Sequence, residues 1–505
     1  MTNNVFRYKE FWGFVFFILI LAVLFLKVTW LFRGNSVESR EDIQGYYNEQ
    51  CGIDVILFDG SDVLRFYDPL DAWNKYGYTS YNYAVSSAQA DMLRFYAEES
   101  RKTQNAELYV FDLRTISFVT DVISEPTLRN WSDSISPFSC IRARGIYSYI
   151  FNRDKSEIDI PSYFIDIINY HTKYDALSDE NQWSYMNTKN IRNVDKGFEP
   201  YINHTPFGRP VITEERENLS SNQIKALSDL VNYCRKEDLN VLFICSPIVI
   251  NEEEQKVMNS VSDFIEASGY EFIDFNKYYD DIGIDFETDY GDVNHVNYLG
   301  AIKFTDYFTK LLNERYDLPD HRNDMSYIMW DDDYEEMSDK RTEWMLSVQE
   351  NLDYHLKAKK NGEILNNIDD FSKWYEYIKN PNYSVVLMIK EMPKNITEDN
   401  PLMTLLYDYE IDLSQKHYMG VWKGDNAIYS SVDDEVAEVK IGVDSGQGKD
   451  TCQLLSELGV INIEGVEYSS DESKIQVVIY DNNYKKVIDY VNLIIERADS
   501  VILNR

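Results

Sequence analysis

The sequence predicts an α/β protein with a three-layer, doubly wound parallel sheet, followed by a smaller β-rich domain. Short apolar segments alternate with amphipathic helical patterns between residues 51 and 318, as in chains that build β-α-β units. Over residues 381–505, short strand patterns follow one another, separated by Asn-Asn and Gly-Asp turns. A length of 505 residues is enough for roughly two to four domains.

The alternating region supplies both the strands and the helices of the predicted sheet. Strands are predicted at 54–58, 80–85, 107–113, 240–245 and 270–275. Helices are predicted at 88–103, 221–237, 252–267 and 298–315. We expect an irregular and helical insertion at about 120–220 and a helical connector at 319–380. In such sheets ligands bind at the carboxyl ends of the strands, so residues that follow a strand are candidates for a functional site.

A long apolar stretch near the N-terminus predicts a membrane anchor. The 22 residues from 11 to 32 are apolar almost throughout, and at about 1.5 Å per residue they can cross a hydrocarbon core of about 30 Å. No small-x-small cleavage pattern follows, which favours an uncleaved, single-pass signal anchor in the cell membrane. Residues 1–10, with Arg7 and Lys9, are expected to form a cytoplasmic tail, and 33–50 a juxtamembrane linker. The weak basic bias favours the N-terminus inside and the main domains outside.

The composition excludes some classes of partner and cofactor. The chain has 86 acidic and 49 basic residues, a formal net charge of −37. This argues against nucleic acid as a partner, because phosphate binding needs clustered basic side chains. It favours solubility as the role of the acidity, and it disfavours an acidic polymer as a partner unless a local basic groove exists. The five cysteines lie far apart without metal-ligand spacing, which argues against a zinc site.

A serine after the first strand and a distant Asp-x-x-His motif are the candidate catalytic residues. Ser61 follows the first predicted strand across an Asp-Gly turn, and Asp292 and His295 lie beyond the last one. A serine hydroxyl becomes a nucleophile when a base takes its proton, and a carboxylate can orient that base. The sheet would bring both segments to one edge. Spacing alone, however, does not separate these residues from incidental pairs in a long chain.

Two charged residues near the end of the third strand have a simpler expected role. Asp112 ends that strand, and we expect its carboxylate to cap the following turn. Arg114 is expected to be a surface charge.

Several stretches resemble one hydrolase family. Asp59-Gly-Ser-Asp-Val-Leu-Arg-Phe-Tyr-Asp-Pro69 resembles the first sequence block of the SGNH (GDSL-type) hydrolases. The likeness is closest to their membrane-anchored bacterial branch, which is related to the D-alanine transfer protein DltD. The stretches 81–89 and 292–301 are similar to the second and last blocks, and Lys196-Gly-Phe also resembles this branch. The resemblance covers about residues 50–315.

The resemblance implies a fold, a reaction and a set of site residues. The fold would be the flavodoxin-like SGNH sheet. Ser61 would be the nucleophile, His295 the base and Asp292 its orienter, with the oxyanion held by the backbone N–H groups of Ser61 and Ser86. The expected protein is an extracytoplasmic acyl esterase or O-acyltransferase, most simply an acetyl transferase, acting on a cell-surface polysaccharide or a teichoic-acid-like polymer. A membrane-bound O-acyltransferase is the partner that this branch implies. The family resemblance implies no metal and no organic cofactor.

The sequence also departs from the family pattern. Asp59 stands where the branch has glycine, Gly60 where it has serine and Asp62 where it has histidine, and the second block has Ser86, Ser87 and Ala88 where glycine is expected. A carboxylate at position 62 near the oxyanion would oppose catalysis unless it points away. The alternative is therefore a catalytically inactive, polymer-binding or scaffolding partner of a membrane-bound O-acyltransferase.

The β-rich domain at 381–505 resembles a different module. Its stretches 383–390, 464–469 and 475–489 resemble the interleukin-like EMT inducer domain. That resemblance implies glycan binding, while an accessory domain of another role stays open.

Overall fold

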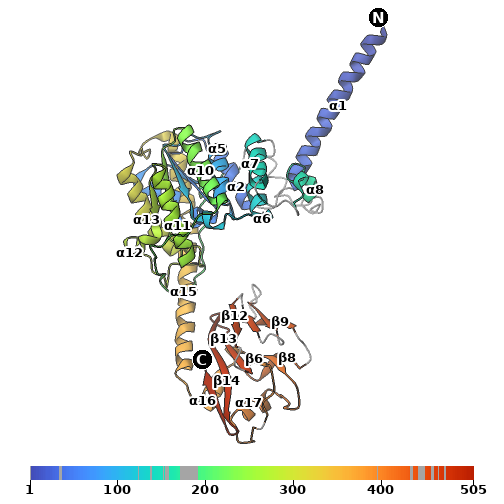
Figure 1. Cartoon of the computed structure of the whole chain (residues 1–505), viewed down its shortest axis with the longest axis vertical. Helices are drawn as coiled ribbons and strands as arrows, with labels where there is room; N and C mark the ends of the chain where they lie inside the picture. The colour runs from blue at the N-terminus through green and yellow to red at the C-terminus, as the bar shows by residue number, and fades with distance from the viewer. Residues whose placement is uncertain are drawn as a thin grey trace. The chain divides into compact units, whose positions relative to one another are not determined.

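The computed structural model describes most of the chain, which divides into two compact units, Met1–Val348 and Gln349–Arg505. The residues outside the description are 1, 33–36, 123, 137–138, 152, 154–157, 171–190, 395, 433–435, 442–449, 456–459, 464–465 and 471–473. Figure 1 shows the α/β elements of the first unit and the β-rich second unit.

The first unit contains a five-stranded, all-parallel sheet in the order β2-β1-β3-β4-β5. The strands are β1 (Val55–Phe58), β2 (Ser80–Asn82), β3 (Leu108–Asp112), β4 (Val241–Cys245) and β5 (Phe272–Asp274). All five strands are buried along their length, which is why β1, β3 and β4 read as nearly continuous apolar runs rather than alternating patterns. This order confirms the predicted α/β class and is the flavodoxin-like one.

Helices cover both faces of this sheet. The α-helices of the unit are α1 (Thr2–Phe32), α2 (Val37–Asn48), α3 (Ser61–Phe66), α4 (Pro69–Tyr76), α5 (Leu93–Ser100), α6 (Glu125–Ser134), α7 (Cys140–Phe151), α8 (Asp166–Tyr170), α10 (Ser221–Lys236), α11 (Glu252–Ala267), α12 (Tyr279–Ile282), α13 (Tyr298–Arg315), α14 (Ile328–Glu336) and the start of α15 (Ser338–Asn366). Short 3-10 helices are η1 (Ala90–Met92), η2 (Arg114–Phe118), η3 (Ile160–Tyr163), η6 (Phe275–Lys277) and η7 (Met325–Tyr327). α13 packs on α3 and α4, while α10 packs on α5. Right-handed crossovers put these two groups on opposite faces.

One of the segments that flank the sheet differs from its predicted role. α2 lies in the predicted juxtamembrane linker, yet Ile43 and Tyr46 are buried in the main core. The predicted helical connector at 319–380 is helical in the structure, where it contains η7, α14 and α15. The predicted membrane span at 11–32 falls on α1, and it stays a prediction: in the part of the chain that the structure describes, no helix is both long and apolar enough to cross a membrane.

The second unit is β-rich, as predicted, and the structure shows that its sheets are antiparallel. A six-stranded sheet has the order β15-β14-β13-β6-β7-β8, and a four-stranded sheet has the order β12-β11-β10-β9. The strands are β6 (Tyr383–Ile389), β7 (Tyr418–Lys423), β8 (Asn426–Ser431), β9 (Val436–Ile441), β10 (Asp450–Leu455), β11 (Val460–Ile463), β12 (Val466–Ser469), β13 (Ile475–Asp481), β14 (Lys486–Arg497) and β15 (Ser500–Asn504), with helices α16 (Phe371–Ile378) and α17 (Leu402–Asp408). Alternate residues of β6 belong to two different cores, so its sheet is covered on both faces.

Gly197 lies in an irregular segment that packs directly against the end of β2. Gly197 has a φ of +83°, and a Cβ there would lie 2.4 Å from the carbonyl oxygen of Asn82. The Asn82 N–H donates to the carbonyl of Lys196 at 3.0 Å, and the Asn82 amide donates to the carbonyl of Gly197 at 3.1 Å. The close approach therefore requires a residue without a side chain at 197.

We expect Gly197→Ala to lower the free energy of unfolding by about 2–4 kcal/mol, since a positive φ costs roughly 1–2 kcal/mol and the steric clash roughly 1–3 kcal/mol more. Gly283→Ala is the matched control, because Gly283 has a φ of +78° with no atom within 4 Å of the added Cβ. Urea unfolding followed by tryptophan fluorescence measures both variants. Equal losses in the two variants would contradict the close approach.

Candidate active site

Ser61 lies at the carboxyl edge of the sheet, at the point where the strand order changes direction. β1 ends at Phe58, Asp59 and Gly60 make the turn, and Ser61 is the first residue of α3. A Cβ at Gly60 would lie 3.0 Å from the carbonyl oxygen of Ala88. The glycine thus lets the Ser61 turn approach the loop after β2, which carries the second sequence block.

His295 and Asp292 share one tight turn beyond β5. The Asp292 carboxylate accepts the backbone N–H groups of Asn294 at 2.8 Å and His295 at 2.9 Å, which closes the turn. The same carboxylate contacts His295 Nδ1 at 2.9 Å and 3.0 Å. Asn297 then caps α13 through the N–H groups of Leu299 and Gly300. The spacing Asp-x-x-His is therefore a local device that orients the imidazole.

The structure brings the three predicted catalytic residues together. Ser61 Oγ lies 2.8 Å from His295 Nε2, although the residues are 234 positions apart. Because Nδ1 faces a carboxylate, the arrangement fits a neutral imidazole with its proton on Nδ1 and Nε2 free to accept the Ser61 hydroxyl. Burial acts to raise the pKa of Asp292, but its bonds to His295 and to the turn outweigh this and lower it. Asp292 is thus held as a carboxylate.

Two residues that the sequence analysis did not single out support the imidazole. The Tyr201 ring meets the His295 ring edge to face, with centroids 5.1 Å apart. The backbone carbonyl of Tyr201 also accepts the N–H of Tyr298 at 2.8 Å, which ties this segment to the start of α13. The guanidinium of Arg65 lies over the Tyr201 ring, 4.7 Å from its centre. Arg65 follows Ser61 by four residues, a spacing that places both on one face of α3. No pattern in the sequence points to Tyr201.

Asp62, the residue after the nucleophile, is fully buried beside the histidine. Its Oδ1 lies 3.4 Å from His295 Nε2, the nitrogen that also contacts Ser61. The guanidinium of Arg114 contacts both oxygens of Asp62 at 3.3 Å, and it also donates to the side chain of Asn294. The prediction that Arg114 is a surface charge is wrong, since its side chain is 5% exposed. Sequence reading missed it because its partner, Asp62, lies on α3, 52 residues away in the sequence.

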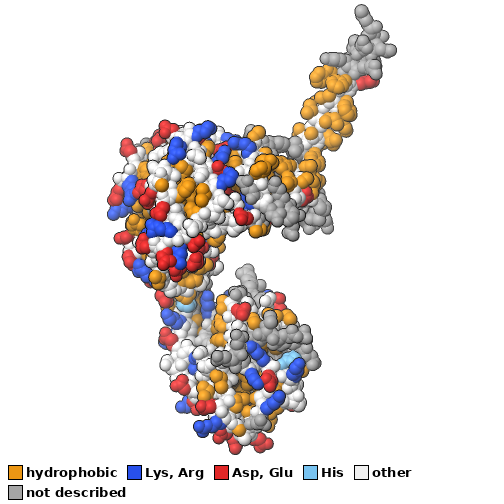
Figure 2. All heavy atoms as spheres, viewed as in Figure 1, with side chains coloured by type: hydrophobic (Ala, Val, Ile, Leu, Met, Phe, Trp, Pro, Cys, Tyr) orange, Lys and Arg blue, Asp and Glu red, His pale blue; other side chains and the backbone are white. Residues whose placement is uncertain are grey.

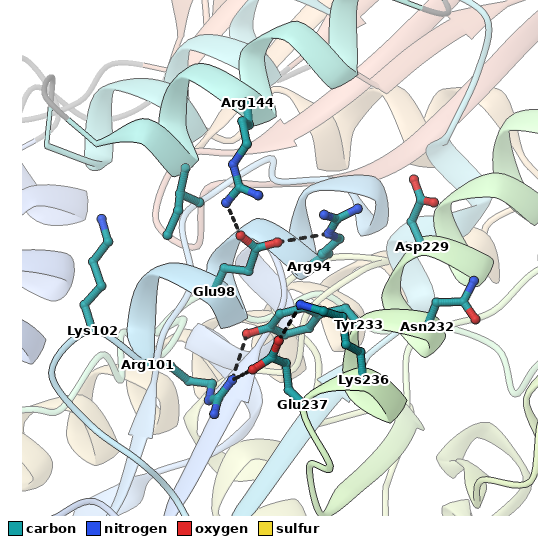
Figure 3. A pocket seen from close by; sticks show the side chains of 11 residues that line it. Arg94, Glu98, Arg101, Lys102, Arg144, Asp229, Asn232, Tyr233, Lys236 and Glu237 are labelled. Atoms are coloured by element: carbon teal, nitrogen blue, oxygen red, sulfur yellow. Dashed lines mark hydrogen bonds and ion pairs between the residues drawn. The ribbon is translucent and has the colours of Figure 1, made fainter.

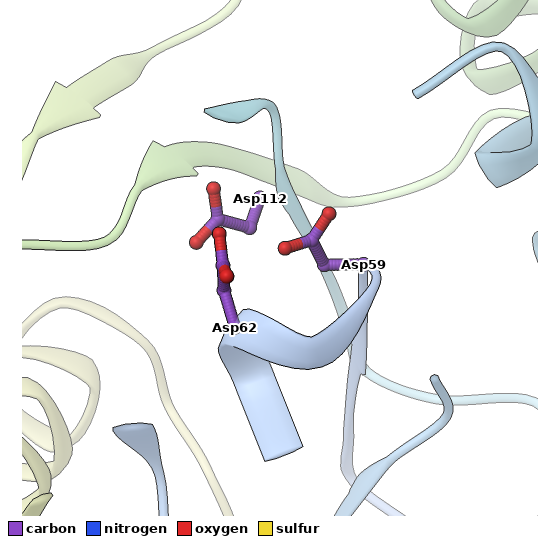
Figure 4. Close-up of side chains that lie close together, drawn as sticks. All are labelled: Asp59, Asp62 and Asp112. Carbon is purple, nitrogen blue, oxygen red and sulfur yellow. The ribbon is translucent and has the colours of Figure 1, made fainter. Parts of the chain in front are cut away.

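Three buried carboxylates meet under the Ser61 turn, as Figure 4 shows. Oxygens of Asp59, Asp62 and Asp112 lie within 4.8 Å of one another. Asp59 accepts the hydroxyl of Thr115 at 3.0 Å, and its other oxygen has no hydrogen-bond partner among the described residues. Asp112 accepts the N–H of Arg114 at 3.0 Å, which confirms that it caps the turn, and it also accepts both the N–H and the hydroxyl of Ser246.

Burial and mutual repulsion keep protons in this cluster. Desolvation, followed by the charges of Asp112 and Asp62, raises the pKa of Asp59 well above its ordinary value. Desolvation, followed by the charge of Asp62, raises the pKa of Asp112 to about 7. Carboxylates in this arrangement offer the oxygen ligands that a hard divalent cation prefers. Arg114 already neutralises Asp62, however, and protons can balance the other two groups, so we assign no metal here.

Ser86, the second predicted oxyanion donor, lies on the turn that faces Gly60. Ser87 has a φ of +66°, a left-handed conformation that usually favours glycine. The turn is held by a bond from the N–H of Ala88 to the carbonyl of Val85 at 3.2 Å and from the amide of Asn130 to the carbonyl of Ser86 at 3.2 Å. The turn therefore keeps its shape although serine, not glycine, stands at position 87.

Comparison with protein-family models and with the sequences of curated proteins found no match. The identity of the site therefore depends on its geometry and on the sequence resemblance described above.

The raised pKa values predict how stability changes with pH. Between about pH 4 and pH 7 the native state keeps protons on Asp59 and Asp112 that the unfolded chain has released, so the free energy of unfolding should fall as pH rises. Asp59→Asn removes one of these buried acids and replaces an unpartnered oxygen with a donor. The gain over the wild type should be about 1–3 kcal/mol at pH 8 and smaller at pH 5, as measured by urea unfolding at both values.

Asp281→Asn, on the exposed surface of α12, controls for the loss of one negative charge. The prediction would be contradicted if Asp59→Asn lowered the free energy of unfolding at pH 8, or raised it more at pH 5 than at pH 8. Asp59 would then be an ionised carboxylate with adequate partners rather than a protonated acid.

Proposed function

We propose that the chain is an SGNH-type serine acyl esterase or O-acyltransferase. It would act on acyl esters, most simply acetyl esters, of a cell-surface polysaccharide or teichoic-acid-like polymer, from a membrane-anchored, extracytoplasmic position. The observation that carries the proposal is the relay from Ser61 Oγ to His295 Nε2 at 2.8 Å and from His295 Nδ1 to Asp292 at 2.9 Å. This is the geometry that serine acyl transfer needs.

The proposed reaction has two halves. Ser61 Oγ attacks the ester carbonyl while His295 Nε2 takes its proton, and the backbone N–H groups of Ser61 and Ser86 stabilise the oxyanion. His295 then gives the proton to the leaving alcohol, and an acyl-enzyme on Ser61 results. Water or a sugar hydroxyl attacks this ester, with His295 again acting as base. Asp292 holds the Nδ1 proton throughout and stabilises the imidazolium.

The pair of Asp62 and Arg114 answers the main objection to catalysis. An uncompensated carboxylate about 4 Å from a developing oxyanion would raise the barrier by about 4 kcal/mol at an effective dielectric constant of about 20, or roughly a thousandfold in rate. Arg114 lies 3.3 Å from both Asp62 oxygens and 3.9 Å from Glu254, so its positive charge offsets part of the charge that Asp62 presents to the oxyanion. This balance supports an active enzyme.

A cavity that has Arg65 in its wall is the proposed place for part of the substrate. It has a volume of about 310 Å³, and its walls include Arg65, Phe198, Lys340 and Trp344. Arg65 connects it to Tyr201 and so to His295. Charged and aromatic walls of this kind suit a polar, ring-bearing substrate better than a free fatty chain.

A second candidate function is a non-catalytic scaffold or polymer-binding partner of a membrane-bound O-acyltransferase. It is favoured by Asp62, whose carboxylate lies 3.4 Å from the same nitrogen that must accept the Ser61 proton. A carboxylate there competes with Ser61 for that nitrogen once it is protonated. Glycan binding by the second unit would fit either candidate.

Kinetics with p-nitrophenyl acetate separate the two candidates. We expect the full-length chain to hydrolyse this small ester, and Ser61→Ala and His295→Ala each to lower kcat/KM by about a thousandfold or more, because each removes a group that the relay cannot replace. Ser86→Ala is the matched control. Its backbone N–H is retained, so its kcat/KM should stay within about threefold of the wild type.

Hydrolysis that persists in folded Ser61→Ala protein, or no hydrolysis by folded wild-type protein, would favour the scaffold.

A further inference from the structure

A second cavity lies where α5, α7 and α10 meet, away from the triad. Its volume is about 540 Å³. Five basic side chains line it: Arg94, Arg101, Lys102, Arg144 and Lys236. We call this cavity the basic cleft. In Figure 2, Lys and Arg side chains are visible over the region of α5 and α10. None of the lining residues belongs to the triad or to the carboxylate cluster.

The charge of the basic cleft is opposite to that of the chain. The whole chain has 86 acidic residues against 49 basic ones, whereas the cleft has five basic residues against the three acidic residues Glu98, Asp229 and Glu237. A chain of this composition attracts an anion only where cations gather locally. The basic cleft meets that condition.

Two carboxylates are each shared between two cations, as Figure 3 shows. Glu98 lies between Arg94, at 3.1 Å, and Arg144. Glu237 lies between Arg101 and Lys236, each at 2.9 Å. The hydrogen bond from Lys236, and then that from Arg101, lower the pKa of Glu237. One carboxylate cannot neutralise two cations, so each group keeps one excess positive charge.

The remaining charges of the cleft cancel. Lys102 is bound by the buried carboxylate of Glu99 at 2.7 Å, and Asp229 is bound by Lys225. The excess of two positive charges therefore comes from the two shared-carboxylate groups. Each arginine in them has five N–H donors, and the Nε of Arg101 is buried without a hydrogen-bond partner among the described residues.

We propose that the basic cleft binds a phosphate-bearing anion. A phosphate monoester carries about 1.5 to 2 negative charges, which matches the excess charge, and its oxygens fit the forked donors of arginine. The cavity is larger than one phosphate group, so it also takes the organic part of a phosphate ester or a second, linked phosphate. Binding here does not depend on the acyl chemistry at Ser61. The phosphate comes either from a small soluble molecule or from a phosphate-containing polymer.

Isothermal titration of the full-length chain tests this site, with inorganic pyrophosphate and poly(glycerol phosphate) as the probes. The test variant is Arg144→Gln/Lys236→Gln, which takes one exposed cation from each group; the two side chains are 54% and 79% exposed, so the fold should tolerate the change. We expect binding to weaken about tenfold, since the variant removes one cation from each shared-carboxylate group and so the excess positive charge of the cleft. Added salt should weaken it further.

The matched control is Arg209→Gln/Arg216→Gln, which removes two cations of similar exposure that are ion-paired elsewhere on the same unit. Its affinity should stay within about twofold of the wild type. Asp229→Asn, which removes an acid from the cleft wall, should bind two- to threefold more tightly. Ser61→Ala should bind like the wild type, so a failed esterase test leaves this site untouched.

Tighter binding of pyrophosphate would identify a small phosphate as the ligand, and tighter binding of the polymer would identify a polymer; either result supports the site. The proposal is overturned if neither probe binds, or if the control variant loses as much affinity as the test variant.

Discussion

The hydrogen bond between Ser61 and His295 joins two turns that are 234 residues apart in the sequence. It depends on the strand order of the sheet, which brings both turns to one edge. β1 and β3 are neighbours at the centre of the strand order, so the turn after β1 opens at the switch point of the sheet. The Asp-x-x-His turn reaches the same edge because α13 packs on α3, the helix that Ser61 begins. Phe66 and Phe304 contact edge to face within that packing and hold the distance between the two helices. A loss of this packing would separate the triad without changing any of its members.

Three carboxylates are buried beside the triad, and their charges are balanced in two ways. Asp62 is neutralised by the guanidinium of Arg114, which also reaches Asn294 on the histidine turn. Asp59 and Asp112 have no such partner, and the raised pKa of each shows that protons do the balancing. Buried charges without partners would destabilise the fold by several kcal/mol each. The position of Arg114 thus serves both the stability of the site and its electrostatics.

Much of the fold and of the triad could be predicted from the sequence because both have local signals. Buried parallel strands are short apolar runs, and an Asp-x-x-His turn closes on itself through the Asp292 carboxylate. Arg114 and Tyr201 could not be predicted in their roles, since a partner from another strand or loop leaves no periodic trace. The sequence shows that Asp59 and Asp62 depart from the family pattern. It does not show how they affect the charge of the site, because that depends on which cation lies next to them. The basic cleft was hidden for the same reason: its cations come from three helices that are distant in sequence.

Reaction with a serine-directed fluorophosphonate tests the central claim most directly. The reagent bonds to a serine only when a base activates its hydroxyl and an oxyanion site receives the phosphoryl oxygen, so it reports on Ser61 without knowledge of the natural substrate. Intact-mass and peptide mass spectrometry should show one adduct, on Ser61, which is lost in Ser61→Ala and strongly reduced in His295→Ala. Folded wild-type protein that forms no adduct at Ser61 would contradict the account, and the site would then be a relay that Asp62 has made inactive.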